Sequence, residues 1–478
     1  MQHVTNVLEF RLESRNEIFL WNYRYAVRSY SIIQSICLRR STLSRILIEN
    51  LGPIKSFEQD VDENLMILIG EQASGKSTIA KTIFFCKSIS DEFKHYVMNQ
   101  DNIIASGHQT PFTGFIKVLR TKFVEYFGTT KHMEPFTIRY EFDNKEHVTI
   151  KLKLGYANIV FSNKLREECE YFIQKLSEYY ATMSLPNDFL SGIDFASLSS
   201  QKESMNKMIN HEISHIFGQD YTSIFVPAGR SMLSTNSEFF HASTPNKYDV
   251  IMNDFIERIR ALQNQYSQRL EDIIEDKKKL SSINIDFERV KKATVLVRKI
   301  LKGDYISDKY GEKIYYSKDK FVKLIQASSG QQEALWIVLL IFSIILNNQR
   351  VYMVIEEPEA HLFPTAQKEM LELIILMINA TSSQVVITTH SPYMLSSANL
   401  LMYSSHVEGA ASGNSSIIDR DYRIKANAVS SYLLSNHIAV DIMDRDTYMI
   451  KADRIDSISE DINNSLDLLL QLEERNGM

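Results

Sequence analysis

The chain has 478 residues, enough to bury one large core or two medium ones. Its formal net charge of −6 at pH 7 gives no global indication of nucleic-acid affinity. The three cysteines, Cys37, Cys86 and Cys169, form no C-x-x-C pair, which favours a reducing compartment and excludes a zinc-hook apex. The longest apolar run, 335–346, is too short to span a bilayer, and no signal peptide is evident. We therefore expect a cytoplasmic protein without a membrane partner.

The first 43 residues differ in character from the rest of the chain. They are rich in arginine and aromatic residues, lack clear periodicity, and precede the natural opening strand at 45–51. We interpret them as an over-extended translation start, with Leu38 or Leu43 as candidate positions of an alternative initiation codon. The alternative is a partner-binding arm.

A phosphate-binding loop comes after the first strands. Residues 46–69 are predicted as strands broken at Gly52-Pro53, as in the antiparallel sheet that packs on a nucleotide. The apolar run 65–69 leads directly into a G-x-x-x-x-G-K-[ST] pattern, and 78–85 continues at helical spacing. The predicted nucleotide-binding residues are Gly70, Glu71, Gln72, Ala73, Ser74, Gly75, Lys76, Ser77 and Thr78. Backbone N–H groups would surround the β-phosphate, Lys76 would reach the β- and γ-phosphates, and Ser77 would ligand Mg²⁺.

The middle of the chain is predicted as mainly helical. A meander of strands at 136–140, 148–152 and 158–161 precedes helical patterns at 163–183 and 198–216. A strand at 223–226 leads to Arg230, which could reach the nucleotide or a partner. One long amphipathic helix is predicted over 248–280 and another over 287–301. The insertion is too short for a coiled-coil rod and would form a stubby arm or a dimerisation pair.

Two features of this insertion allow alternative interpretations. Residues 211–215 read H-E-x-x-H, the zinc-protease pattern, but Tyr221 occupies the place of a third metzincin histidine. We favour a polar helix face, with zinc peptidase chemistry as the alternative. Lysine and arginine clusters at 277–279, 291–292 and 298–302 could track a phosphate backbone. A solvated face balanced by nearby acidic residues is the favoured interpretation.

Three more motifs lie in the C-terminal half. Ser328, Ser329, Gly330 and Gln331 belong to an S-S-G-Q-Q-E sequence that precedes an apolar helix at 334–346. A buried-strand pattern at 351–355 ends in Glu356 and Glu357, and another at 384–389 ends in His390. Each motif alone is moderate evidence, and their order and spacing strengthen the prediction of one nucleotide site.

In this order the four motifs resemble an ABC-type ATPase head. The sequences E-E-P-E-A-H-L-x-P and T-H-S-P are similar to the overcoming-lysogenization-defect, RecF and SMC branch of the AAA family ATPases. The resemblance implies an α/β fold, a P-loop NTPase head with a mixed sheet flanked by helices, split by a helical or short coiled-coil insertion. The expected division is an extension at 1–43, head halves at 44–162 and 321–406, the insertion at 163–320, and a tail with a terminal helix at 407–478.

The resemblance also implies residue roles. Glu356, where the family usually has Asp, would hold Mg²⁺ through water, and Glu357 would be the general base. His390 would contact the γ-phosphate. The signature residues 328–331 would bind the γ-phosphate held by another subunit, so two heads would meet around two ATP molecules. Phe363 stands where relatives often have His, and Gln109 is a candidate for the Q-loop glutamine.

Local D-x-D matches at 419–421 and 444–446 lack room for a Toprim nuclease domain, so we expect no built-in nuclease. Stand-alone heads of this kind resemble the ATPase subunits of anti-phage systems such as PARIS and, less closely, Septu. The leading hypothesis is therefore an ATP-dependent sensor or scaffold that controls a separate nuclease or toxin effector until a phage trigger protein appears. The alternatives are a RecF- or SMC-like DNA-repair or DNA-tethering ATPase, and an ATP-binding module with structural use only.

Overall fold

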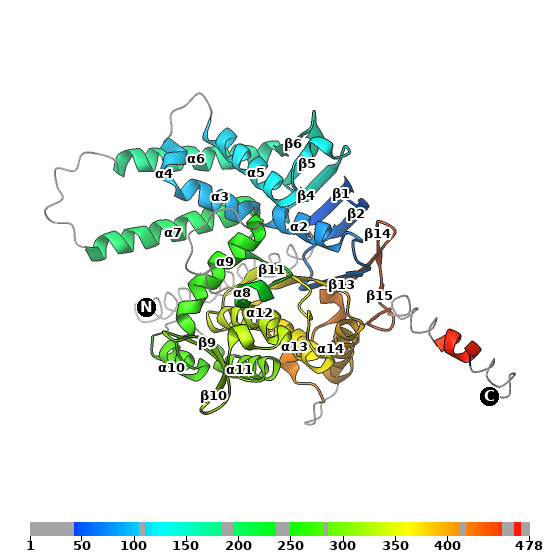
Figure 1. Cartoon of the computed structure of the whole chain (residues 1–478). Helices are drawn as coiled ribbons and strands as arrows, with labels where there is room; N and C mark the ends of the chain where they lie inside the picture. The colour runs from blue at the N-terminus through cyan, green and yellow to red at the C-terminus, as the bar shows by residue number, and fades with distance from the viewer. Residues whose placement is uncertain are drawn as a thin grey trace, which may run out of the picture.

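The computed structural model describes residues 43–104, 110–183, 195–235, 249–280, 285–410, 417–451 and 463–469 (Figure 1). The predictions for residues 1–42 and for Gln109 fall outside these residues. The same holds for most of the terminal helix expected near the C-terminus, of which only 463–469 is described, as an exposed helical segment.

A mixed sheet of eleven strands organises the described part of the chain. Its order is β6-β5-β4-β1-β2-β14-β13-β3-β12-β11-β7. The bounds are β1 Arg45–Leu51, β2 Ile54–Asp60, β3 Leu65–Gly70, β4 Thr137–Glu141, β5 His147–Lys153, β6 Tyr156–Phe161, β7 Thr222–Val226, β11 Val351–Glu356, β12 Gln384–Thr389, β13 Val429–Ser435 and β14 Ile438–Asp441. Strands β13, β3, β12, β11 and β7 are parallel neighbours, whereas β1, β2, β4, β5 and β6 pair antiparallel.

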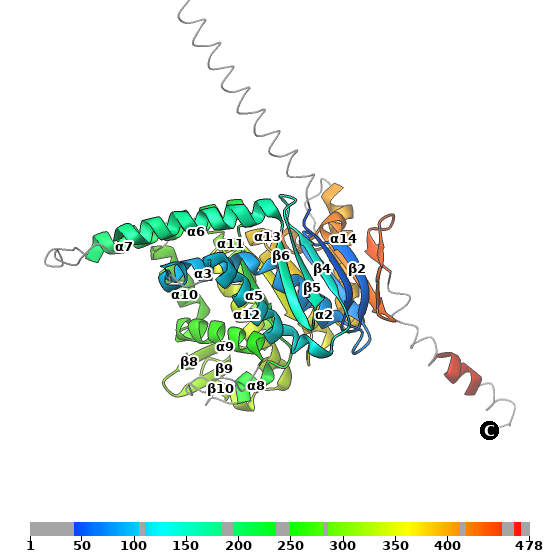
Figure 2. The same ribbon diagram turned by 90° about the horizontal axis from the view of Figure 1, so that it is seen from above.

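Helices lie on both sides of the main sheet (Figures 1 and 2). Their bounds are α2 Lys76–Lys87, α3 Ile89–Met98, α4 Gln100–Ile104, α5 Pro111–Phe127, α11 Phe287–Leu301, α12 Ser329–Leu346, α13 Pro364–Thr381 and α14 Pro392–Ala410. Leu65, Ile67 and Ile69 pack with α11, α12, α13 and α14, while Met66 and Leu68 pack with α2, α3 and α5. Because strand side chains alternate between faces, a strand covered on both sides is apolar throughout, which explains the continuous run in β3.

Helix α12 is the most apolar element. Its first turn is closed by a capping box in which Ser328 and Gln331 each bond the other's backbone N–H. By length and composition α12 could cross a membrane, yet 89% of it is buried inside the structure. A helix that is hydrophobic all round and enclosed by protein is a core helix. It begins at Ser329, five residues before the predicted start, so the signature lies within its first turns.

Two helices of the predicted insertion project from the head. Helix α6 runs over Asn163–Met183 and α7 over Phe195–Phe217, and both extend from the same side of the molecule (Figures 1 and 2). They contact each other and the α3–α5 layer. Beyond α7, strand β7 rejoins the main sheet beside β11. The sheet therefore continues through the interval that the sequence assigned to the insertion.

The single long helix predicted over 248–280 is wrong. The chain forms α9 at Val250–Gln263, a 3₁₀ turn at Asn264–Tyr266, and α10 at Leu270–Leu280. Tyr266 is buried, and its hydroxyl donates to the carbonyl of Leu339 in α12 at 2.6 Å. Docking of this side chain on the core helix accompanies the break in the helix. A small sheet comes after α11, formed by β8 Asp304–Asp308, β9 Gly311–Ser317 and β10 Lys320–Lys323.

The interval 407–478, expected as a tail beyond the head, contributes to the main sheet. Strand β13 pairs in parallel with β3, the strand before the phosphate loop, and β14 connects it to β2. The contact is close: a Cβ added at Gly70 would lie 2.4 Å from the carbonyl oxygen of Leu434. The sequence did not predict β13, because parallel pairing with a distant segment leaves no local signal.

Candidate nucleotide site

The predicted phosphate loop joins β3 to α2, which begins at Lys76. Gly75 precedes the helix with φ +103, a backbone conformation that favours glycine. A Cβ at Gly75 would lie 2.2 Å from Cδ1 of Ile54, so the Ile54 side chain would have to shift to accept any larger residue. Ser74 is buried, while Glu71, Gln72, Ala73 and Ser77 are exposed. The loop therefore presents its backbone, the Ser77 side chain and the start of α2 to one surface, an arrangement suited to anions.

Lys76 lies beneath this loop. Its side chain is buried, and its Nζ donates to the carbonyls of Gly70 at 2.8 Å and Glu71 at 2.7 Å. Burial lowers the pKa of Lys76, while the carboxylates of Glu357 and Glu359 act in the opposite direction. Lys76 thus lies within electrostatic reach of two glutamates from the other half of the sequence.

Glu356 ends β11 and is almost fully buried, at 7% exposure. Its Oε2 accepts from the backbone N–H of Ala228 at 3.2 Å. Its Oε1 is buried and has no hydrogen-bond partner among the described residues. A buried carboxylate oxygen without a donor fits a cation or a cation-bound water, since unpaired buried charge is costly. The chemistry of Glu356 therefore fits its predicted Mg²⁺ role, and the predicted ligand Ser77 has an exposed side chain.

Glu357 and His390 come together at the ends of adjacent parallel strands. Their side chains are 41% and 39% exposed, and His390 Nε2 lies 3.3 Å from Glu357 Oε1. Glu357 adopts φ +45, and its N–H donates to the carbonyl of Thr388 at 2.9 Å. This backbone conformation is uncommon for a residue with a side chain and is held here by neighbouring strands. Both side chains face solvent, as a general base and a phosphate contact require.

A third glutamate was not assigned a role from the sequence. Glu359 is buried, and its Oε1 accepts from the Thr389 hydroxyl and from the His390 N–H at 3.0 Å. It therefore fixes the backbone that carries the His390 side chain. The third glutamate of the E-E-P-E motif was the only sequence feature that could have indicated this role.

The signature residues occupy the start of α12. Ser328 and Ser329 are exposed, while Gly330 packs against the backbone of His361. A Cβ at Gly330 would lie 2.7 Å from the His361 carbonyl oxygen. The amino terminus of a long helix carries partial positive charge and unpaired N–H groups, which suits an anion presented by another molecule.

A family profile described as an AAA ATPase domain matches residues 42–190 and 162–395. The chain belongs to this family. No curated protein matches the sequence. The two matched segments of the AAA ATPase domain contain all four motifs, from the phosphate loop to His390.

Three solved SMC heads align with this AAA ATPase domain protein at low identity. An SmcHead bound to the C-winged helix domain of ScpA shares 10% identity, covers 84% of this chain and 97% of its own, and gives a TM-score of 0.39. The Thermotoga maritima SMC head domain shares 9% identity, covers 84% of this chain and 98% of its own, and gives a TM-score of 0.34. A Pyrococcus furiosus Smc head with an extended coiled coil, bound to the C-terminal domain of ScpA, shares 12% identity, covers 88% of this chain and 99% of its own, and gives a TM-score of 0.36.

The structure corrects the role suggested for Arg230 in this AAA ATPase domain. Its side chain is fully buried at 0% exposure, so it presents no surface to nucleotide or partner. Its Nη1 donates to the carbonyls of Pro227 at 2.6 Å and Glu356 at 2.7 Å, and Nη2 to that of Glu357 at 2.9 Å. Arg230 thus supports the backbone beneath the two predicted site glutamates.

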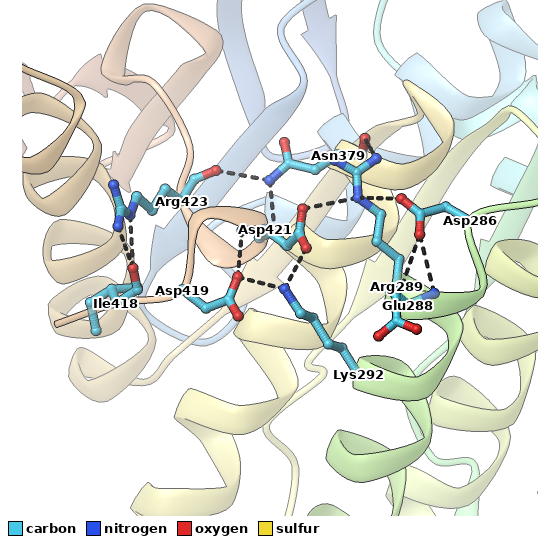
Figure 3. Close-up of polar contacts among 9 residues, drawn as sticks. All are labelled: Asp286, Glu288, Arg289, Lys292, Asn379, Ile418, Asp419, Asp421 and Arg423. Carbon is cyan, nitrogen blue, oxygen red and sulfur yellow. Dashed lines mark hydrogen bonds and ion pairs between the residues drawn. The ribbon is translucent and has the colours of Figure 1, made fainter. Parts of the chain in front are cut away.

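The D-x-D pair at 419–421 is engaged in ion pairs. Lys292 lies between the carboxylates of Asp419 and Asp421, at 2.7 and 2.6 Å, and Arg289 donates to Asp421 at 2.9 Å (Figure 3). Asn379 on α13 donates to the carbonyls of Asp421 and Arg423. These contacts fasten the segment before β13 onto α11 and α13 of the AAA ATPase domain.

The basic clusters of α10 and α11 also have acidic partners. Ion pairs join Lys278 to Glu275, Lys279 to Asp276 and Lys291 to Glu288. These contacts favour the solvated helix face over a stripe for nucleic acid. Of the H-E-x-x-H residues on α7, Glu212 pairs with Lys175 at 3.8 Å. Across the described segments, no group of three or more His, Cys, Asp or Glu is placed to hold a metal ion.

Proposed function

We propose that this chain binds ATP with Mg²⁺ and hydrolyses it slowly to ADP and phosphate. One observation carries the proposal: the phosphate loop, the Glu356–Glu357 pair and His390 follow the carboxyl ends of three adjacent parallel strands, β3, β11 and β12. Ligands of open parallel sheets bind outside this edge. The family match and the glycine-dependent shape of the loop support the same conclusion.

The proposed reaction assigns one task to each side chain. The Lys76 ammonium group would exchange its hydrogen bonds to the Gly70 and Glu71 carbonyls for contacts with the β- and γ-phosphates. Glu357 would accept a proton from the attacking water as that oxygen forms its bond to γ-phosphorus and the bond to the ADP oxygen breaks. His390 would hydrogen-bond the γ-phosphate oxygens. Mg²⁺, held by Ser77 and Glu356, would neutralise charge on the β- and γ-phosphates.

We further propose that two copies meet head to head around two ATP molecules. Three large apolar side chains support this self-association: Ile325 is 55% exposed, Phe363 74% and Tyr393 53%. They lie within a few residues of the signature, the His361 segment and His390, respectively. Exposed apolar side chains around one functional surface are typical of an interface. The signature at 328–331 would then contact the γ-phosphate of the partner copy.

The wider role that we propose is control of a separate protein. The ATP state of the assembly would hold or release a nuclease or toxin effector, and a phage protein would be the trigger. This part rests on the resemblance to anti-phage ATPase subunits and on the short α6–α7 arm. The alternative is a DNA-repair or DNA-tethering ATPase, for which the ion-paired lysines of α10 and α11 give no added support.

ATP turnover by the purified full chain, with and without duplex DNA, tests the reaction. Native mass spectrometry of the chain expressed with its neighbouring genes, with and without ATP, tests the assembly.

Two results together support the proposal: phosphate release that Lys76→Ala abolishes, and an ATP-dependent complex that contains a second, nuclease-sized protein. A homodimer that binds only DNA, and whose turnover DNA stimulates, supports the repair ATPase. An intact ATP-bound dimer without turnover identifies a structural module and overturns the proposed hydrolysis.

A further inference from the structure

A fully buried ion pair connects the signature helix to the backbone of the candidate catalytic glutamate. Arg230 follows β7, and Glu333 lies on the second turn of α12. Glu333 accepts from the N–H groups of Arg230 at 3.1 Å and Ser231 at 3.0 Å. The Arg230 Nε donates to the Glu333 carbonyl at 3.1 Å and lies 3.4 Å from its carboxylate. Both side chains are nearly inaccessible, at 0% and 4% exposure.

The other end of the same guanidinium reaches β11. It donates to the carbonyls of Glu356 and Glu357 at 2.7 and 2.9 Å. The planar fork of arginine can serve several acceptors in fixed directions, whereas an ammonium group cannot span them in the same way. One side chain therefore ties three segments together: the loop after β7, the first turns of α12, and the end of β11.

The backbone at Glu357 is the part of this assembly that needs support. Its φ of +45 is unfavourable for a side-chain-bearing residue, so the conformation persists only where its surroundings impose it. Its N–H donates to the Thr388 carbonyl at 2.9 Å and to the Thr388 hydroxyl at 3.4 Å. Its carbonyl accepts from the Ala360 N–H at 3.1 Å, within its own turn, and from Arg230 Nη2 at 2.9 Å. Arg230 supplies the only one of these four bonds that comes from a side chain linked to α12, so its loss would weaken the anchoring of Glu357 near His390.

We propose that Arg230 and Glu333 are positioning residues that transmit the placement of the signature helix to Glu357. This inference rests on the proposed ATP-dependent head-to-head assembly, because the signature surface would be occupied by the partner copy's nucleotide. A displacement of α12 on closure would move Glu333, then Arg230, then the carbonyls of Glu356 and Glu357. Each active site would thereby respond to the nucleotide held by the other subunit. The burial of the pair keeps this connection free of water and sensitive to small shifts.

The test uses Arg230→Lys and Glu333→Gln in the full chain. Both variants retain most of the side-chain volume. Arg230→Lys removes the guanidinium that spans the three segments, and Glu333→Gln removes the negative charge that faces Arg230. The matched control is Arg350→Lys, since Arg350 lies at the opposite end of β11 and is 42% exposed. We expect kcat to fall about tenfold or more in both test variants, with the ATP dissociation constant and KM changed by less than about threefold. The control should keep both parameters. Unchanged kcat in folded test variants would overturn the inference, as would a proportional loss of nucleotide affinity.

A second measurement is independent of turnover. Hydrogen exchange of the amides of Glu356, Glu357, Glu359 and Ala360 should accelerate in both test variants and not in the control, because the backbone around Glu357 is held less firmly. Exchange equal to wild type would overturn the inference. If the wild-type chain shows no ATP turnover while exchange still responds, the proposed hydrolysis fails and the positioning role stands.

The link to the signature is tested in a Glu357→Gln background. There, Glu333→Gln should still form the ATP-dependent dimer, since Ser328 and Ser329 remain exposed on an intact capping box. Loss of that dimer would show that Glu333 only holds the signature surface and would overturn the proposed transmission.

Discussion

The imidazole of His390 lies 3.3 Å from the carboxylate of Glu357, measured from Nε2 to Oε1. The two residues are 33 positions apart and meet because β11 and β12 are parallel neighbours whose carboxyl ends share one edge. A phosphate approaching His390 would therefore arrive beside the candidate general base. This proximity makes the two side chains a pair that should respond together to bound nucleotide.

Replacement of Glu357 by glutamine should separate ATP binding from hydrolysis. The amide has nearly the same shape but cannot accept the proton of the attacking water, so turnover should fall about 100-fold or more. ATP should remain bound and the closed assembly should accumulate, as measured by nucleotide retention and native mass spectrometry. Lys76→Ala is the contrasting variant, since it should lose the nucleotide itself. Hydrolysis at the native rate by Glu357→Gln would show that another group activates the water.

Replacement of Gly330 by alanine should disturb the signature surface. The added methyl group would meet the His361 carbonyl oxygen at 2.7 Å, and a backbone atom cannot move aside as a flexible side chain can. We expect ATP binding by the phosphate loop to persist, while the ATP-dependent dimer dissociates about tenfold more readily, a difference of about 1.4 kcal/mol. Analytical ultracentrifugation with and without ATP measures both states. A dimer as stable as that of the wild type would show that the backbone at His361 moves to accept the methyl group without weakening the dimer.

The motif-bearing part of this structure was predictable because its signals are local. The phosphate loop needs a strand, two glycines and a helix in immediate succession, and β3, Gly70, Gly75 and α2 provide them. The glutamate pair and His390 likewise sit directly after apolar runs that form buried strands. The rule that parallel strands share a carboxyl edge then brings these residues together.

The remaining features depend on contacts between distant segments. Strand β13 pairs with β3 across more than 360 residues of sequence, and nothing near 429–435 indicates that partner. The break at Tyr266 accompanies docking of its side chain against α12, a contact that amphipathic periodicity does not reveal. Arg230 was noticed as an arginine beside small residues, but its role depends on carbonyls more than 100 residues away. Local propensity cannot encode such tertiary contacts.

The central position of β13 predicts a large effect of proline at Ser431. This residue is fully buried, lies opposite Ile67 of β3, and would lose a backbone N–H within the sheet. Ser431→Pro should destabilise the fold by about 3 kcal/mol or more, seen as a lower denaturant midpoint.

Ser431→Ala is the matched control for that substitution. The Ser431 Oγ is buried without a hydrogen-bond partner in the part of the chain that the structure describes. Removing it should leave stability unchanged or raise it by about 1 kcal/mol. Equal midpoints for the proline and alanine variants would contradict the placement of β13 inside the sheet.

Asp143 predicts a dependence of stability on pH. Burial raises the pKa of its carboxyl to about 6, with the charge of Asp62 acting in the same direction and Lys87 in the opposite one. The folded state thus holds the proton more tightly than the unfolded chain between about pH 4 and pH 6, so the free energy of unfolding falls as pH rises through that window.

Asp143→Asn should remove this contribution. The variant should match the wild type near pH 4 and exceed it by about 1 kcal/mol at neutral pH, a value reduced from the full linkage because the side chain is only partly buried. Urea unfolding across this pH range measures the difference, with Asp319→Asn as an exposed control that should leave the profile unchanged. A wild-type profile parallel to that of Asp143→Asn would show that ionisation of this carboxyl costs the folded state nothing. The substitution breaks no hydrogen bond to Oδ1, because this oxygen has no donor among the described residues. A stability difference between wild type and Asp143→Asn that depends on pH can therefore be assigned to the charge of the carboxylate.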